Sequence, residues 1–196
     1  MTEYAWVCQC GAFKVQLKAP PIFDMNCHCR SCVAPARYLN AKYPETSKSG
    51  LVNDGVGKTF FHLKDMELPE GGLTYLKVGD AGENIRSYTT CCGTLFNSAG
   101  GKAMPLAARP LTRNNIRNSD GSPYVSTETP TDVLTKHTYG DYTLPEGHFE
   151  GPSPAVKAGF SSFVPVPDDA SRAKYDQNWF KVGAEVNEVV PITWEN

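Results

Sequence analysis

The cysteines of this 196-residue chain stand in three short clusters, and their spacing restricts the fold more than any other feature of the sequence. The first cluster is the C-x-C pair at 8–10, the second is C-H-C-R-S-C at 27–32, and the third is C-C-G at 91–93. Thiolates two or three residues apart can converge on one soft metal ion, and Zn²⁺ is the commonest occupant of such sites. The sequence therefore predicts a fold organised around bound metal.

The outer two clusters together offer four thiolates, which is the number of ligands that a structural zinc ion takes. Cys8 and Cys10 supply two of them, and the adjacent Cys91 and Cys92 supply the others. Gly11 follows the first pair and permits a turn in which both sulfurs face one point, and a glycine also follows the second pair. We predict one structural Zn²⁺ that joins the first strand to the segment that ends near residue 92.

The middle cluster has a different ligand count. Cys27, Cys29 and Cys32 give three thiolates within six residues. Three protein ligands with an open fourth position is the arrangement of a catalytic zinc, and the open position takes a water or a substrate thiol. A thiol on such an ion is deprotonated, and it is then a nucleophile at neutral pH. Arg30 and Arg37 are candidate contacts for the carboxylates of an anionic substrate.

A histidine could instead close the middle cluster as a second structural zinc site. The candidates are His28, His62, His137 and His148. His28 lies between two ligand positions, so we expect its ring to point away from the metal. A closed second site would favour a non-catalytic, zinc-stabilised module that binds a protein partner, whereas an open site favours an enzyme.

Composition limits the kinds of partner and the compartment. With 19 basic and 21 acidic residues the net charge is −2, which gives no electrostatic footprint for binding nucleic acid or a membrane surface. No apolar run approaches the roughly 18 residues of a membrane span, and the first residues do not resemble a signal peptide. The cysteine count of 7 is odd, which argues against a pure disulfide framework. We expect a cytoplasmic protein with reduced thiols; the sequence does not predict an oligomeric state.

The pattern of apolar residues in the first half of the chain is typical of β-strands. Alternation predicts a strand at 13–18. Further strands are expected at 59–63, 73–78 and 84–90, with turns between them at the Gly-Gly and Gly-Asp pairs at 71–72 and 79–80. Residues 43–58 are polar and rich in turn formers, so we expect a loop there.

The second half has less periodicity. Prolines and polar residues dominate 110–154, which predicts long loops with short strands. One short helix is expected at 170–181 and a last strand at 186–194. We expect a single domain over the whole chain, mainly β, with the motifs in a core at about 1–100 and an elaborated, loop-rich part at about 101–196.

Three motifs carry a resemblance to a known family. C-Q-C-G at 8–11, C-H-C-R-S-C at 27–32 and R-S-Y-T-T-C-C-G-T-L-F at 86–96 resemble the glutathione-dependent formaldehyde-activating enzymes, a family that includes the centromere-protein-V-like proteins. The resemblance covers roughly residues 1–98. It implies a β-rich fold with a structural zinc held by the first and third clusters. It also implies a labile zinc at the middle cluster that binds a small substrate thiol, and a carbon–sulfur lyase activity on a glutathione–formaldehyde adduct.

The third motif departs from the pattern of that family, which resembles R-x-F-C-x-x-C-G-T. Aligning Arg86 and Cys92 with this pattern puts Thr89 where the first cysteine belongs, and Cys91 follows two positions later. Either Cys91 is the fourth ligand of the structural zinc, or that site has three cysteines and another group.

Overall fold

The structure is a computed structural model that describes residues 4–47, 50–52, 55–79, 84–99, 108–127, 131–133, 186 and 188–190. β-Strands are the predominant secondary structure of these residues, with a single α-helix beside them, which confirms the predicted mainly β class. The elements in chain order are β1 (Tyr4–Val7), β2 (Lys14–Leu17), β3 (Phe23–Cys27), α1 (Arg30–Lys42), β4 (Leu51–Val52), β5 (Gly55–His62), η1 (Leu63–Asp65), β6 (Met66–Glu67), β7 (Leu73–Val78), β8 (Asn84–Thr89), β9 (Leu95–Ala99), β10 (Ala108–Thr112), η2 (Arg113–Asn115), β11 (Ile116–Asn118), β12 (Thr131–Val133) and β13 (Val189–Val190).

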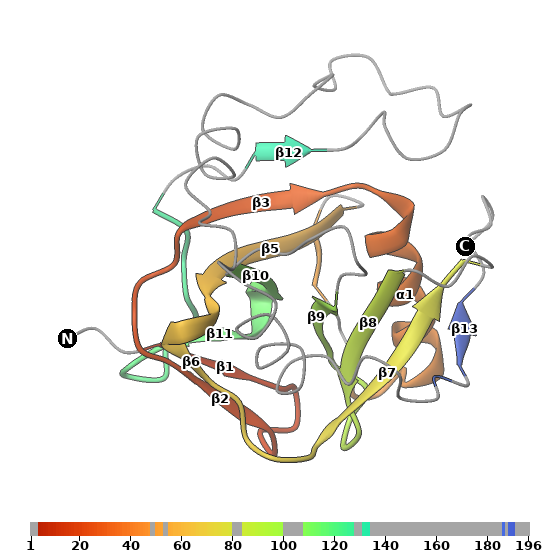
Figure 1. The fold of residues 1–196 in the computed structure, drawn as a ribbon, viewed down its shortest axis with the longest axis horizontal. Helices are drawn as coiled ribbons and strands as arrows, with labels where there is room; N and C mark the ends of the chain where they lie inside the picture. Colours follow the sequence, from red (N-terminus) through yellow and green to blue (C-terminus); the bar gives the residue numbers. More distant parts are fainter. Residues whose placement is uncertain are drawn as a thin grey trace, which may run out of the picture.

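Among the described residues the strands form a smaller and a larger sheet (Figure 1). The smaller sheet has the order β11-β1-β2-β6, and its pairings are antiparallel. The larger sheet has the order β12-β3-β5-β10-β9-β8-β7-β13, with β4 paired to β5. Its central pairings are antiparallel, whereas β12 and β13 are added in parallel at the two edges. Each edge strand therefore comes from a part of the chain distant from its neighbour.

The larger sheet has an apolar cluster on each face. One cluster joins its strands to α1 and contains Val33, Ala36 and Leu39 of the helix together with Phe60 of β5. The second cluster joins the opposite face to the smaller sheet. It is rich in aromatic side chains, among them Trp6, Phe13, Phe61 and Phe96. Trp6 stacks edge-on against Phe96 with ring centroids 4.8 Å apart. The molecule is thus layered, with the larger sheet between α1 and the smaller sheet.

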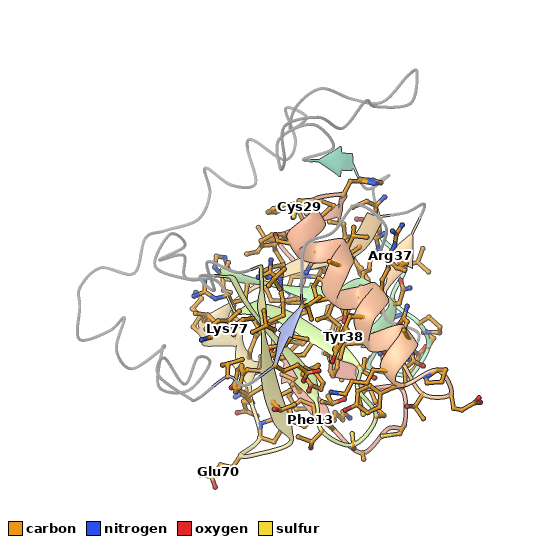
Figure 2. The ribbon with its side chains drawn as sticks, turned by 90° about the vertical axis from the view of Figure 1, so that its right-hand side faces the viewer. Phe13, Cys29, Arg37, Tyr38, Glu70 and Lys77 are labelled. Atoms are coloured by element: carbon orange, nitrogen blue, oxygen red, sulfur yellow. The ribbon has the colours of Figure 1, made fainter. Side chains whose placement is uncertain are left out.

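Helix α1 was not predicted from the sequence. It contains Pro35, and an interior proline costs about 3 kcal/mol relative to alanine. Tertiary packing outweighs this penalty, because Val33, Ala36 and Leu39 recur at three-residue spacing and are buried against the sheet. Figure 2 shows α1 lying across the sheet with Cys29 at one end and Tyr38 nearer the other.

The predicted strands are largely confirmed. The strand at 73–78 coincides with β7, the one at 84–90 exceeds β8 by one residue, and the one at 13–18 contains β2. The predicted loop at 43–58 is wrong over its last part, because β4 and the start of β5 lie there. Residues 55–58 are buried, and an added Cβ at Gly55 or Gly57 would meet another side chain, so the glycines of this last part reflect close packing and not an exposed loop.

Several expectations concern the second half of the chain. The helix predicted at 170–181 lies outside the described residues, as does most of 110–154. Within the tail at 186–194 the structure describes β13, which agrees with the predicted last strand. None of the described helices has the length and the apolar character that crossing a membrane would require.

Candidate metal centres

The seven cysteines gather into two groups. Within each group, all sulfur atoms lie within 4.8 Å of one another. The four-cysteine group consists of Cys8, Cys10, Cys91 and Cys92, and the three-cysteine group consists of Cys27, Cys29 and Cys32. Both sets match the sequence prediction residue for residue.

The four-cysteine group has the dimensions of a tetrahedral sulfur site. Its Sγ–Sγ separations include 3.5 Å for Cys8–Cys10, 3.3 Å for Cys10–Cys91 and 3.7 Å for Cys91–Cys92. A Zn–S bond of about 2.3 Å puts the sulfurs of a tetrahedral site about 3.8 Å apart. The four sulfurs therefore fit a tetrahedral soft ion with only a small outward shift.

The C-x-C turn between β1 and β2 places the first two sulfurs. The amide of Gly11 donates to the carbonyl of Cys8 at 3.0 Å, and the left-handed φ of 78° at Gly11 lets the chain reverse. The amide of Phe13 then donates to the Cys8 sulfur at 3.2 Å. A backbone N–H on the sulfur stabilises a thiolate there, as a metal ligand requires.

The turn after β8 places the other two sulfurs, and it settles the question raised by the departure at Thr89. Cys91 belongs to the group, and the hydroxyl of Thr89 lies 3.3 Å from the Cys92 sulfur. The hydroxyl of Thr94 contacts the same sulfur at 3.0 Å. Cys91 thus completes the set of four, and Thr89 supports Cys92 without being a member of the set.

The thiols of this group differ in acidity. Although burial raises it, the hydrogen bonds from Thr89 and Thr94 lower the pKa of Cys92 to about 6. Burial, with the neighbouring Cys10 thiol, raises the pKa of Cys91 to about 12, and burial also raises the pKa of Cys8. Cys92 is therefore the member of the group that already holds a thiolate at neutral pH.

The three-cysteine group is built where β3 runs into α1. Cys27 is the last residue of β3, Cys29 is the N-cap of α1, and Cys32 lies in the first helical turn. The amides of Cys32 and Val33 both donate to the carbonyl of Cys29, at 2.9 and 3.0 Å. This tight turn brings the three sulfurs together at the helix N-terminus, where the helix dipole favours negative charge. All three cysteines are buried.

Buried cations lie beside these sulfurs. The Nη2 of Arg86 on β8 donates to the hydroxyl of Ser31 at 3.1 Å and lies 3.9 Å from the Cys32 sulfur. The Ser31 hydroxyl in turn lies 3.2 Å from the sulfur of Cys29. Lys58 on β5 is 1% exposed and also acts on Cys32 through its charge.

These surroundings separate the acidities of the three thiols. Hydrogen bonds from Cys27 and Cys29, helped by the charges of Lys58 and Arg86, hold the pKa of Cys32 well below its usual value against the effect of burial. The pKa of Cys27 is raised well above its usual value by its hydrogen bonds to the other two thiols and by burial. The surroundings therefore favour the thiolate form of Cys32 over that of Cys27.

The candidate histidine ligands do not join the three-cysteine group in the described residues. The ring of His28 lies over Gly55, where an added Cβ would come within 2.9 Å of it, so it points away from the sulfurs as expected. His62 is the last residue of β5, six residues beyond Val56, which pairs with Cys27. Six strand residues span about 20 Å, so His62 is too distant to be a ligand. His137 and His148 lie outside the described residues.

The two arginines predicted as substrate contacts belong to α1. Arg37 is exposed, and Figure 2 shows it on the flank of the helix, away from the end that carries Cys29. Arg30 is the first residue of the helix, and its side chain lies outside what the structure describes. Their contact with a substrate stays a prediction.

Sequence reasoning missed the residues that support the sulfurs. These are Ser31, Lys58 and Arg86 at the three-cysteine group, and Thr89 and Thr94 at the four-cysteine group. One signal was available: along β8, Arg86 alternates with Ser87 and shares its face with the apolar Tyr88. A cation on the inward face of a strand indicates a buried anionic partner.

Helix α1 connects the two groups. Its N-terminal turn carries Cys29, and the turn after its C-terminus holds the segment of Cys92, because Thr46 donates to the Cys92 carbonyl at 3.0 Å and Ser47 to the Gly93 carbonyl at 3.1 Å. In Figure 2, Phe13, whose amide binds Cys8, lies toward the opposite end of the helix from Cys29. The two centres are thus separate in space and joined by one rigid element.

A scan against models of known protein families and a search of the curated proteins each gave no match to this chain.

Proposed function

We propose that this protein is a zinc-dependent enzyme of the carbon–sulfur lyase type that acts on a small thiol adduct such as the glutathione adduct of formaldehyde. The observation that carries the proposal is the three-cysteine group. Three sulfurs converge, and no histidine, cysteine or carboxylate of the described residues completes the set. A soft ion held by three thiolates keeps a position for an exchangeable ligand.

The chemical role of zinc follows from the donor set. Zn²⁺ bound by Cys27, Cys29 and Cys32 would act as a Lewis acid and lower the pKa of a substrate thiol, so that a thiolate is available at neutral pH. The four-cysteine group would hold a second zinc that is retained and contributes to folding. Reduced thiols at both centres are consistent with a cytoplasmic location.

The reaction needs no oxidant and no other cofactor. In the forward direction the sulfur of the thiol attacks the carbonyl carbon of the aldehyde, and a carbon–sulfur bond forms. The electron pair of the carbon–oxygen π bond moves to the oxygen, which takes the proton that the thiol gave up. The lyase direction is the reverse, in which the carbon–sulfur bond breaks and the sulfur is protonated again.

The chain's own groups support the thiolate state of the site. Arg86 and Lys58 place positive charge next to the sulfurs, and Ser31 links Arg86 to Cys29 by hydrogen bonds. Arg30 and Arg37 are proposed to meet the carboxylates of the substrate. The resemblance of the three motifs to the glutathione-dependent formaldehyde-activating family supports the same activity.

One observation favours a second candidate function. The three cysteines are only 2–6% exposed, which is the condition of a structural site. If a group outside the described residues completes the site, the protein would be a non-catalytic, zinc-stabilised module that binds a protein partner. The two functions therefore differ in whether the fourth position accepts an added ligand.

The test is a thiol titration of the full-length protein loaded with Co²⁺ in place of zinc. Charge-transfer absorption from sulfur to cobalt grows with each added thiolate, so glutathione entering the three-cysteine group should give a saturable increase. Cys29→Ser should abolish this increase while the absorption of the four-cysteine group persists. Incubation of the zinc form with ¹³C-formaldehyde and glutathione, followed by NMR, should show the adduct forming faster than without protein.

One result would decide against the enzyme, and another would decide against its electrophile only. If no thiol changes the cobalt spectrum at any concentration, the fourth position of the metal is closed. The protein would then be the non-catalytic module. A saturable change without faster adduct formation would keep the thiol site and exclude formaldehyde as the electrophile.

A further inference from the structure

Arg86 is a buried cation whose contacts lie on the three-cysteine group. Arg86 is 4% exposed. Its Nη1 donates to the carbonyl of Ile85 at 2.9 Å, and its Nη2 contacts Ser31 and Cys32. The Nε atom is buried and has no hydrogen-bond partner in the described structure. No carboxylate of the described residues forms an ion pair with Arg86.

A buried guanidinium requires a counter-charge nearby. The free energy needed to remove a charge from water is several kcal/mol unless an opposite charge compensates it. Arginine cannot relieve this by losing its proton, because its pKa is too high. In the described part of the chain, the sulfur of Cys32 lies 3.9 Å from the Nη2 of Arg86 and can carry the negative charge. The sulfur group is therefore the counter-charge of Arg86, and Arg86 is that of the sulfur group.

The charges around the metal-loaded three-cysteine group determine which kind of fourth ligand the metal favours. Three thiolates and one divalent ion leave a single negative charge, and Arg86 places its positive charge 3.9 Å from the Cys32 sulfur. Lys58 pairs in register with Met25, which lies in the same apolar cluster as the cysteines, so both cations are on the α1 side of the sheet. A buried positive charge at this range stabilises an anionic thiolate on the metal relative to a neutral imidazole.

We propose that Arg86 is the positioning residue of the three-cysteine group: it is the counter-cation that stabilises the metal–thiolate cluster and makes an anionic sulfur, not a neutral nitrogen, the favoured fourth ligand. The identity of that ligand rests on the proposed function. The effect of Arg86 on the metal itself does not, because it concerns only the three thiolates that the chain supplies.

The chain offers a matched control in Arg109. Arg109 is 5% exposed on β10 and, like Arg86, donates its Nη1 to the carbonyl of the preceding residue, at 3.1 Å. It pairs in register with Phe61, which belongs to the aromatic cluster on the opposite face of the sheet. Replacing Arg109 removes an equally buried guanidinium without touching the face of the sheet that carries the three-cysteine group.

The first measurement is the Co²⁺ affinity of the three-cysteine group in the full chain, read from the spectral component that Cys29→Ser removes. Arg86→Gln should weaken this affinity by about 10–100-fold, the size of effect seen when a residue that supports metal ligands is lost. Arg86→Lys keeps the charge and should retain most of the affinity, and Arg109→Gln should leave it unchanged. Equal affinities in Arg86→Gln and the wild type would overturn the proposal.

The second measurement is the ratio of the affinities of the cobalt form for 2-mercaptoethanol and for imidazole. The wild type should prefer the thiol, and Arg86→Gln should reduce that preference by about tenfold or more, as expected for an opposite charge removed from close range. Arg86→Lys should restore the preference. A preference that is the same in all three proteins would also overturn the proposal.

The outcomes separate this proposal from the proposed function. If the wild type takes up no thiol, the proposed function fails, and the Co²⁺ affinity still decides the role of Arg86. If thiol enters but Arg86→Gln changes neither quantity, the function stands and Arg86 is only a buried packing residue. Should Arg86→Gln not fold, Ser31→Ala gives the answer: it removes the hydrogen-bond link but keeps the charge, so the preference for thiol should persist, and its loss would contradict the proposal.

Discussion

The ring of Tyr43 lies directly against Gly93, so closely that a Cβ added at Gly93 would be 2.1 Å from Tyr43 Cδ2. Gly93 also has a left-handed φ of 69°. Gly93→Ala should therefore destabilise the fold by about 3 kcal/mol or more, from backbone strain and overlap together. Denaturant unfolding of the metal-loaded protein measures this.

Gly11 provides the control for that substitution. Its φ of 78° is similar, but nothing lies within 4 Å of its added Cβ, so Gly11→Ala should show only the backbone strain of about 1–2 kcal/mol. Tyr43→Ala should partly rescue Gly93→Ala. Equal destabilisation by the two glycine substitutions would mean that the ring contact is absent in solution.

Elemental analysis should find between one and two zinc ions per chain in freshly purified, reduced protein. The ion in the four-cysteine group should survive purification, because four thiolates hold it. Ion bound by the three-cysteine group should be lost first on dialysis against a mild chelator. Freshly reduced protein without zinc would contradict both metal assignments.

Serine substitutions should separate the two centres by stability. Cys8→Ser or Cys92→Ser should strongly destabilise or unfold the chain, because the free energy of structural metal binding, about 10–16 kcal/mol, contributes directly to folding. Cys29→Ser should leave a folded protein, since serine is a good N-cap and Cys29 caps α1. Thermal unfolding gives the melting temperatures of these variants. A melting temperature of Cys29→Ser as low as that of Cys8→Ser would identify the three-cysteine group as a structural site.

The attachment of β13 should depend on pH through Glu188. Glu188 accepts hydrogen bonds from Lys42 at 2.6 Å and from Tyr88 at 2.5 Å. Although burial opposes it, these bonds lower the pKa of Glu188. A lowered carboxyl pKa stabilises the folded state above the ordinary value of about 4.3, and the contribution disappears as pH falls through the lowered value.

Hydrogen exchange can follow this detachment. The amide of Gly79 donates to the carbonyl of Val190 in β13, so its protection reports on the pairing of β13 with β7. Protection should fall as the solution is taken below about pH 4. In Glu188→Gln it should be lower at neutral pH and lose this dependence; an unchanged profile in the variant would exclude Glu188 as the cause.

The cysteine groups could be predicted because their ligands are local pairs, and the chemistry of sulfur leaves few other reasons for such spacing. The strand β2 was predictable for a similar reason, since the alternation of apolar and polar residues along it reports which face is buried. Helix α1 was not predictable in this way, because Pro35 interrupts its pattern and only packing on the sheet stabilises it.

The residues that support the sulfurs were identified only in the three-dimensional structure. Arg86 is 55 residues from Ser31. The two side chains meet because α1 packs on the face of the larger sheet to which β8 presents Arg86. Thr89 aligns with a cysteine of the family pattern, yet in the structure its hydroxyl contacts the nearby sulfur of Cys92. The cysteines are evident in the local sequence, whereas Arg86 and Lys58, which act on Cys32, come from distant strands.

The two centres also differ in when they can form. The sulfurs of the three-cysteine group lie within six residues of chain, so they can meet in an unfolded polypeptide. Cys10 and Cys91 are separated by 81 residues, so bringing them together costs more loop-closure entropy than bringing the three local cysteines together. A nascent chain would thus capture metal at 27–32 early and complete the other centre last. Stopped-flow mixing of unfolded protein with Co²⁺ should show two phases in that order, and a single phase would contradict it.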